Sequence, residues 1–146
     1  MIKKKSKVAE KLNADIYIEP VIFLSEKAPQ NIEKIVSELI SMRGIIRLCI
    51  CLEPKRVIYD YQRWGKREKT LEFKEIIELV GGVKTRLKKM TENSMEHLLI
   101  QMEEVTLLVL TQQKLLLFVQ CERKTTKLPV AIVKAKQIMQ ALRNLN

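Results

Sequence analysis

The 146 residues of this chain, 17.1 kDa in all, are 47% hydrophobic, which is enough to bury one good core and leaves little room for a second. Lys and Arg number 27 against 17 Asp and Glu, and the formal net charge of +10 favours anionic partners such as nucleic acid, anionic lipid or an acidic protein surface. No apolar run approaches the roughly 18 to 20 residues that cross a bilayer, which excludes a membrane-spanning helix.

The first 28 residues differ in composition from the rest. Residues 1–7 are rich in lysine, and the charged residues that follow, among them Glu10 and Asp15, interrupt any signal-peptide core, so we expect a cytoplasmic protein. Residues 16–24 are mostly apolar, but Pro20 cannot donate a ladder hydrogen bond, so this run is either an edge strand or an extended arm. We predict a basic N-terminal arm over residues 1–28, with an extra edge strand as one alternative, and a domain over residues 29–146.

A helix and a hairpin are predicted next. Pro29 suits a first helical turn, and apolar residues from Ile32 to Ile40 recur at helical spacing, which predicts an amphipathic helix ending near Gly44. Residues 45–52 and 57–61 are rich in β-branched and aromatic residues. The short connection between these two runs predicts a hairpin.

The pattern then indicates a second, longer helix. A polar and basic connection over residues 62–69 leads to Thr70, a suitable N-cap, and the helix should end near Met90. Gly81 and Gly82 lie inside it and should each cost about 1 kcal/mol relative to alanine, so either some contact offsets that cost or the helix bends there. An apolar stripe runs along the predicted helix: Phe73, Ile76, Ile77, Val80, Val83 and Leu87.

The last part of the chain predicts three strands and a helix. Residues 98–102, 105–110 and 115–121 are apolar runs with short connections, which is typical of an antiparallel meander. Residues 128–145 then repeat apolar positions at helical spacing. The predicted fold class is therefore α+β: a five-stranded antiparallel sheet with a long central helix and flanking N- and C-terminal helices.

Side chains that could carry chemistry are few. His97, the only histidine, has no nucleophile motif around it, so a structural role is favoured over a catalytic one. Cys49 and Cys51 share one face of a predicted strand. Together with Cys121 and His97 they make four possible zinc ligands, but zinc sites usually take two thiolates from a tight turn, and these two cysteines do not have that spacing. We prefer reduced, buried thiols, because an odd number of cysteines argues against a disulfide framework. Gly81-Gly82 lacks the spacing of a phosphate loop. We predict no enzyme, no metal and no cofactor; a site completed only across a dimer is the alternative.

A basic segment around the single tryptophan is the best candidate for binding a partner. Arg63, Trp64 and Arg67 follow the predicted hairpin, and Lys55 and Arg56 lie in its turn. An aromatic ring among cations can stack on a base or pack on a protein, but it can equally be a solvated loop. A basic nucleic-acid-binding module, using these residues and the lysines at 3–7, is therefore the rival to a protein-binding function, although no known recognition module is present.

The order helix, two strands, long helix, three strands, helix resembles the roadblock family of dynein light chains and small-GTPase regulators, whose fold is related to longin domains. The resemblance covers residues 29–146. It is carried by the helix that opens onto Gly44-Ile45-Ile46, the long helix over 71–90, the strand pair at 105–110 and 115–119, and the closing helix after Pro129.

That resemblance implies a non-enzymatic homodimer that scaffolds or regulates a Ras-like small GTPase or a larger complex. Family members pair through the long helix and the strand beside it, so two sheets become one. Gly81 and Gly82 suit such a pairing, because two backbones can approach closely where side chains are absent. The predicted dimer interface consists of Phe73, Ile76, Ile77, Val80, Gly81, Gly82, Val83 and Leu87, with Leu98 and Ile100 of the next strand.

Overall fold

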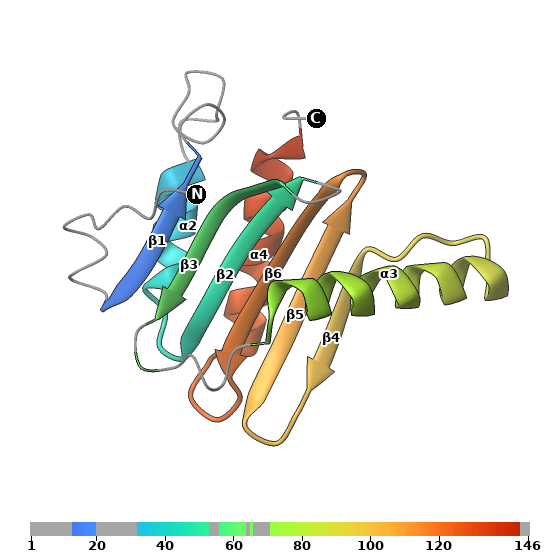
Figure 1. Ribbon diagram of the computed structural model, residues 1–146. Helices are drawn as coiled ribbons and strands as arrows, with labels where there is room; N and C mark the ends of the chain where they lie inside the picture. Colours follow the sequence, from blue (N-terminus) through green and yellow to red (C-terminus); the bar gives the residue numbers. More distant parts are fainter. Residues whose placement is uncertain (1–12, 20–31, 53–55, 64, 66–70, 144–146) are drawn as a thin grey trace.

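The computed structural model describes residues 13–19, 32–52, 56–63, 65 and 71–143, and it shows an α+β fold (Figure 1). Three helices and six strands lie within these residues. In chain order they are β1 (Ala14–Ile18), α2 (Ile32–Ile40), β2 (Ile45–Leu52), β3 (Arg56–Arg63), α3 (Phe73–Met90), β4 (His97–Gln101), β5 (Val105–Gln112), β6 (Leu115–Glu122) and α4 (Leu128–Ala141). None of these helices is both long and apolar enough to span a membrane.

All six strands form one antiparallel sheet in the order β1-β3-β2-β6-β5-β4. The prediction of five strands was wrong by one. The sixth strand is β1, which pairs with β3 from Ala14 opposite Arg63 to Ile18 opposite Tyr59. The alternative of an edge strand in the N-terminal segment is therefore the one observed for residues 14–18, while residues 20–24 of the same apolar run lie outside the described residues.

Helices cover both faces of the sheet (Figure 1). On one face, α2 and α4 pack over a core that includes Leu48, Leu117 and Val119. The Lys134 ammonium of α4 lies 2.6 Å from the Glu38 carboxylate of α2 and ties these two helices together. On the other face α3 is the one helix among the described residues, and it lies over a smaller cluster that includes Leu107 and Phe118. The described residues therefore form a three-layer sandwich, with two helices on one face of the sheet and one helix on the other.

Local sequence explains where several elements begin and end. Gly44 has φ +92°, and a Cβ on it would collide with the Thr126 hydroxyl, so only glycine fits the turn between α2 and β2. The α3 helix begins at Phe73, with Glu72 in the N-cap position and no side-chain capping hydrogen bond. Thr70, the predicted N-cap, lies outside the described residues. The predicted bounds of β2 and the predicted end of α3 at Met90 are confirmed.

Candidate functional site at the free sheet edge

The first half of α3 belongs to the core of its own chain. The side chains of Ile76 and Val80 are 0% and 2% exposed and pack against strands β5 and β6. Phe73 is half-buried and its ring lies 6.1 Å from that of Phe118, centroid to centroid. Ile77 also packs on this cluster. These four residues of the predicted dimer interface therefore serve the protomer, and the buried Ile76 and Val80 are not available to a second copy.

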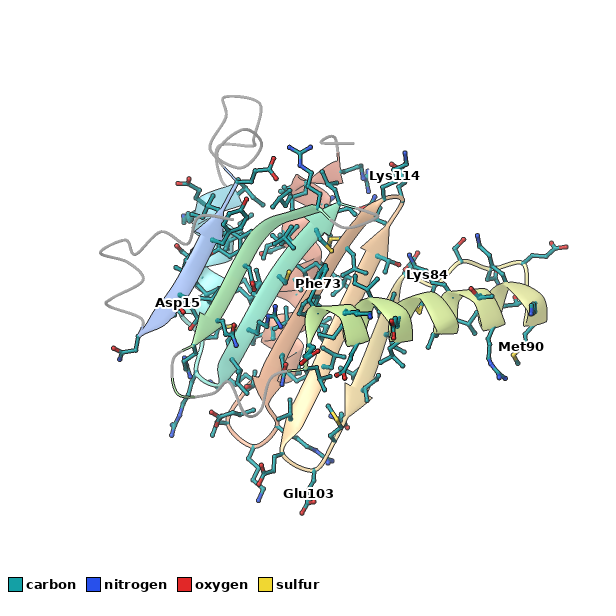
Figure 2. All side chains as sticks on the ribbon, in the orientation of Figure 1. Asp15, Phe73, Lys84, Met90, Glu103 and Lys114 are labelled. Carbon is teal, nitrogen blue, oxygen red and sulfur yellow. The ribbon has the colours of Figure 1, made fainter. Side chains whose placement is uncertain are left out.

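The second half of α3 extends past the sheet. Residues 81–90, which we call the overhang, continue beyond β4 with no strand of the described residues beneath their far end (Figure 2, where Phe73 lies over the sheet and Met90 at the free end). Val83 and Leu87 are half-buried, Met90 is 81% exposed and Leu79, just before the overhang, is 40% exposed. The apolar stripe thus runs on where the chain's own sheet has ended.

Neither glycine of α3 is required by the protomer. Both Gly81 and Gly82 are exposed, and a Cβ placed on either would meet nothing within 4 Å. The helix continues without a break from Phe73 to Met90. Two glycines in a helix interior cost about 1 kcal/mol each relative to alanine. No contact among the described residues offsets that cost.

The strand beneath α3 has a free edge. Within the described residues β4 pairs only with β5, from His97 opposite Leu110 to Gln101 opposite Thr106, so its outer backbone groups face away from the sheet. Leu98 and Ile100 point toward α3 and are half-buried. On and beside the same strand, apolar surface is exposed at two side chains: Leu99 at 40% and Met102 at 37%. A free edge with exposed apolar side chains is the usual signature of strand pairing with another chain.

A buried polar cluster, which was not predicted from the sequence, anchors the start of α3. Arg47 is 9% exposed, its Nη1 donates to the Leu71 carbonyl at 2.9 Å, and its Nε donates to Asp60 Oδ1 at 3.3 Å. The guanidinium also lies 5.3 Å from the centre of the Phe118 ring. The Leu71 amide in turn donates to Gln120 Oε1 at 3.1 Å. The signal that could have revealed this cluster is that Arg47 is the only charged residue in the apolar run of β2.

The predicted basic patch is not assembled as expected. Arg56 and Arg63 stand at opposite ends of β3, about 24 Å apart along the strand, so they do not form one surface. The Arg56 guanidinium forms an ion pair with the Glu19 carboxylate and donates hydrogen bonds to it, which raises the pKa of Arg56. Arg63 is half-buried. Lys55, Trp64 and Arg67 lie outside the described residues, so their part of the prediction is not tested.

The sulfur and histidine side chains do not converge. Cys49 and Cys51 are buried on the α3 side of the sheet, whereas Cys121 is buried on the other side. Burial raises the pKa of the Cys49 thiol well above its ordinary value, so this thiol is protonated and unreactive at neutral pH. His97 is exposed at the start of β4, beside a shallow pocket of about 330 Å³. The described residues contain no group of three or more His, Cys, Asp or Glu side chains that could hold a metal ion.

No protein-family model and no curated protein sequence matches the chain. Solved structures do. The gliding protein MglB from Thermus thermophilus superposes with a TM-score of 0.64 at 16% identity, over 86% of this chain and 95% of that one. An MglB with a tetrameric arrangement gives 0.62 at 17%, over 86% and 94%. A Roadblock/LC7 domain from Streptomyces avermitilis gives 0.55 at 9%, over 76% and 90%. At these identities the likeness concerns the fold, and the chain has the roadblock fold, as its sequence pattern indicated.

Proposed function

We propose that the chain is a non-enzymatic homodimeric module that scaffolds or regulates a Ras-like small GTPase or a larger complex. The observation that carries this proposal is the mismatch between α3 and the sheet it covers. An 18-residue helix is about 27 Å long, whereas the distance from β6 to β4 is only about 10 Å. A second copy, placed edge to edge along β4, would supply the missing sheet beneath the overhang.

Half-buried apolar side chains on α3 and β4 support such a dimer. In an isologous pair, Val83 and Leu87 of one copy would cover Leu98 and Ile100 of the other, and the same contact would occur twice. The free β4 edges would pair, which removes an exposed edge that natural proteins otherwise protect. The MglB with a tetrameric arrangement is a precedent for assembly among proteins of this fold.

The GTPase part of the proposal comes from the roadblock resemblance. Its test begins with purified wild-type chain, used to capture partners from the source cell, followed by their identification by mass spectrometry. A captured Ras-like GTPase is then purified, and its GTP hydrolysis and nucleotide release are measured with and without the chain. A specific change in either rate, of tenfold or more, supports regulation, and stable binding without a rate change supports scaffolding. Capture of proteins that include no GTPase contradicts this part.

Nucleic-acid binding is the rival function, supported by the net charge of +10. The separation of Arg56 from Arg63 weakens it, because the predicted basic patch is divided between two ends of a strand. Affinity for DNA or RNA that depends on phosphate contacts falls steeply with salt. A titration against both nucleic acids from 50 mM to 200 mM salt tests this. Binding at low salt that weakens by several orders of magnitude would favour the rival, and no binding at 50 mM salt would dismiss it.

A further inference from the structure

One side of α3 carries charges arranged symmetrically, with inverted sign, about Gly82. Glu75 and Lys89 each lie seven residues from Gly82, and Glu78 and Arg86 each lie four. Residues spaced by three, four and seven share one side of a helix, so these five form a single stripe. If two such helices lie antiparallel and cross at Gly82, each acid faces a base of the second copy.

The side chains on this stripe are free to meet a partner. Glu75, Glu78, Arg86 and Lys89 are all exposed, and Gly82 between them leaves open space. In the part of the chain that the structure describes, none of the four charged residues forms an ion pair. Their pattern of two acids before Gly82 and two bases after it is therefore not explained by contacts within the protomer.

The adjoining side of the helix, centred on Gly81, suits a second copy less well. Lys74, Lys84 and Lys88 lie there with Glu78 at the border, so two copies crossing at Gly81 would place Lys74 against Lys88 twice. The chain's own loop over residues 91–96 also runs back along this side (Figure 1). Lys84 and Lys88 line a pocket of about 400 Å³ together with Asn93 and Ser94 of that loop. Only the Gly82 side is both open and self-complementary.

The position of Gly82 along the helix agrees with a two-fold axis at the sheet edge. Phe73 lies over Phe118 of β6, and the midpoint between β4 and a neighbouring copy's β4 is two and a half strand spacings farther, about 12 Å. At about 1.5 Å per residue that distance corresponds to roughly eight residues of helix. The two-fold axis would therefore pass close to Gly81 and Gly82.

We infer that the chain recognises a second copy of itself through an antiparallel α3 pair that crosses at Gly82 and is held in register by Glu75 to Lys89 and Glu78 to Arg86 contacts. This inference rests on the proposed dimer and adds its register and its selectivity. Gly82 allows the helix backbones to approach at the axis, where any side chain would meet its own symmetry copy. The charges favour a like chain over other roadblock-fold chains, because a partner without this pattern leaves them unpaired.

Two charge-reversed variants test the register. One carries Glu75→Lys with Glu78→Lys, and the other carries Arg86→Glu with Lys89→Glu. Each variant alone places four like-charged contacts across the axis, which should raise the dimer Kd on the order of 10- to 100-fold at low salt. An equimolar mixture restores all four contacts, so a heterodimer should form with a Kd within about threefold of wild type.

The matched control reverses two charges that lie away from the stripe, Lys84→Glu with Lys88→Glu, and should leave the Kd within about threefold of wild type. Circular dichroism checks that each variant is folded, and differently tagged chains with light scattering report which pairs form. Unchanged self-association of both reversed variants, or a mixture that fails to pair, would overturn the inference while the dimer itself remains. A wild-type chain that is monomeric would overturn the dimer and the inference together.

Discussion

The two halves of α3 have the same apolar pattern and different surroundings. In the first half, Ile76 and Val80 are buried against β5 and β6. In the second half, Val83 and Leu87 continue the stripe and Met90 is 81% exposed, because the sheet ends at β4. Helical periodicity thus identifies the apolar face of α3, and the sheet shows which part of that face the chain itself buries. The unburied part of the face favours contact with a second molecule.

Deleting apolar atoms from the two halves should have unequal effects on the protomer. Ile76→Ala removes a fully buried side chain and should lower the free energy of unfolding by about 2 to 5 kcal/mol. Leu87→Ala in the overhang should lower it by less than about 1 kcal/mol. Urea unfolding at protein concentrations too low for self-association measures both. Equal losses would show that the overhang is already covered by its own chain.

The next largest effect on stability is expected at Arg47, which anchors the start of the first half of α3. Arg47→Met removes the hydrogen bonds to Asp60 and the Leu71 carbonyl and should cost about 1 to 3 kcal/mol of unfolding free energy. Amide exchange should quicken at residues 73–76 more than at residues 105–112. The control is Arg123→Met, which loses one exposed hydrogen bond to the Met102 carbonyl. If exchange in the first turn of α3 stays at the wild-type rate, Arg47 does not anchor the helix.

Substitutions of Gly81 and Gly82, at the boundary between the two halves of α3, test where two copies of the helix cross. Gly82→Leu should weaken self-association by about tenfold or more, because the side chain would lie at the helix crossing, an effect of about 1.4 kcal/mol. Gly81→Leu, whose side chain would point about 100° away around α3, should change it by less than about threefold. Both should raise protomer stability by about 0.5 to 1 kcal/mol, since each position is exposed and open. Sedimentation velocity over a concentration series measures association. Equal effects from both substitutions would contradict the proposed crossing point.

Much of the fold could be predicted because it depends on local pattern. The β-branched and apolar run after Gly44 predicted β2 to the residue, and the stripe of α3 predicted its end. Strand β1 was left open because Pro20 in the same apolar run permits either an edge strand or an arm. Whether β1 joins the sheet depends on pairing with β3, more than 40 residues away, and local pattern does not report such pairing.

The candidate site was less predictable for the same reason. The periodicity of α3 grouped Ile76 and Val80 with Val83 and Leu87, although the first pair is covered by the chain and the second pair is at the overhang. The role of Arg47 depends on Asp60 and Leu71, which only the folded sheet brings together. Arg56 and Arg63 looked close in the sequence, but an eight-residue strand separates them in space.

The smallest effect is expected on the other face of the sheet, where Lys134 of α4 pairs with Glu38 of α2. This pair serves as a reference, because it lies far from α3. A hydrogen bond from Lys134 lowers the pKa of the Glu38 carboxyl below its ordinary value of 4.5. The ionised carboxylate therefore stabilises the fold above about pH 4.5, and this contribution is lost as the pH falls through the lowered folded-state pKa. Glu38→Gln should lower Tm by about 1 to 2 °C at pH 7, with no difference from wild type once the Glu38 carboxyl of the wild type is protonated. Thermal scans from pH 7 to pH 3 measure this, and a Tm difference that is independent of pH would contradict it.

The molar mass of the wild-type chain in solution tests the central claim most directly. Light scattering across a concentration series at physiological salt should give twice the 17.1 kDa of one chain, because a second copy completes the sheet beneath the overhang. A mass of 17.1 kDa at every concentration, with the overhang and the β4 edge left uncovered, would contradict the account.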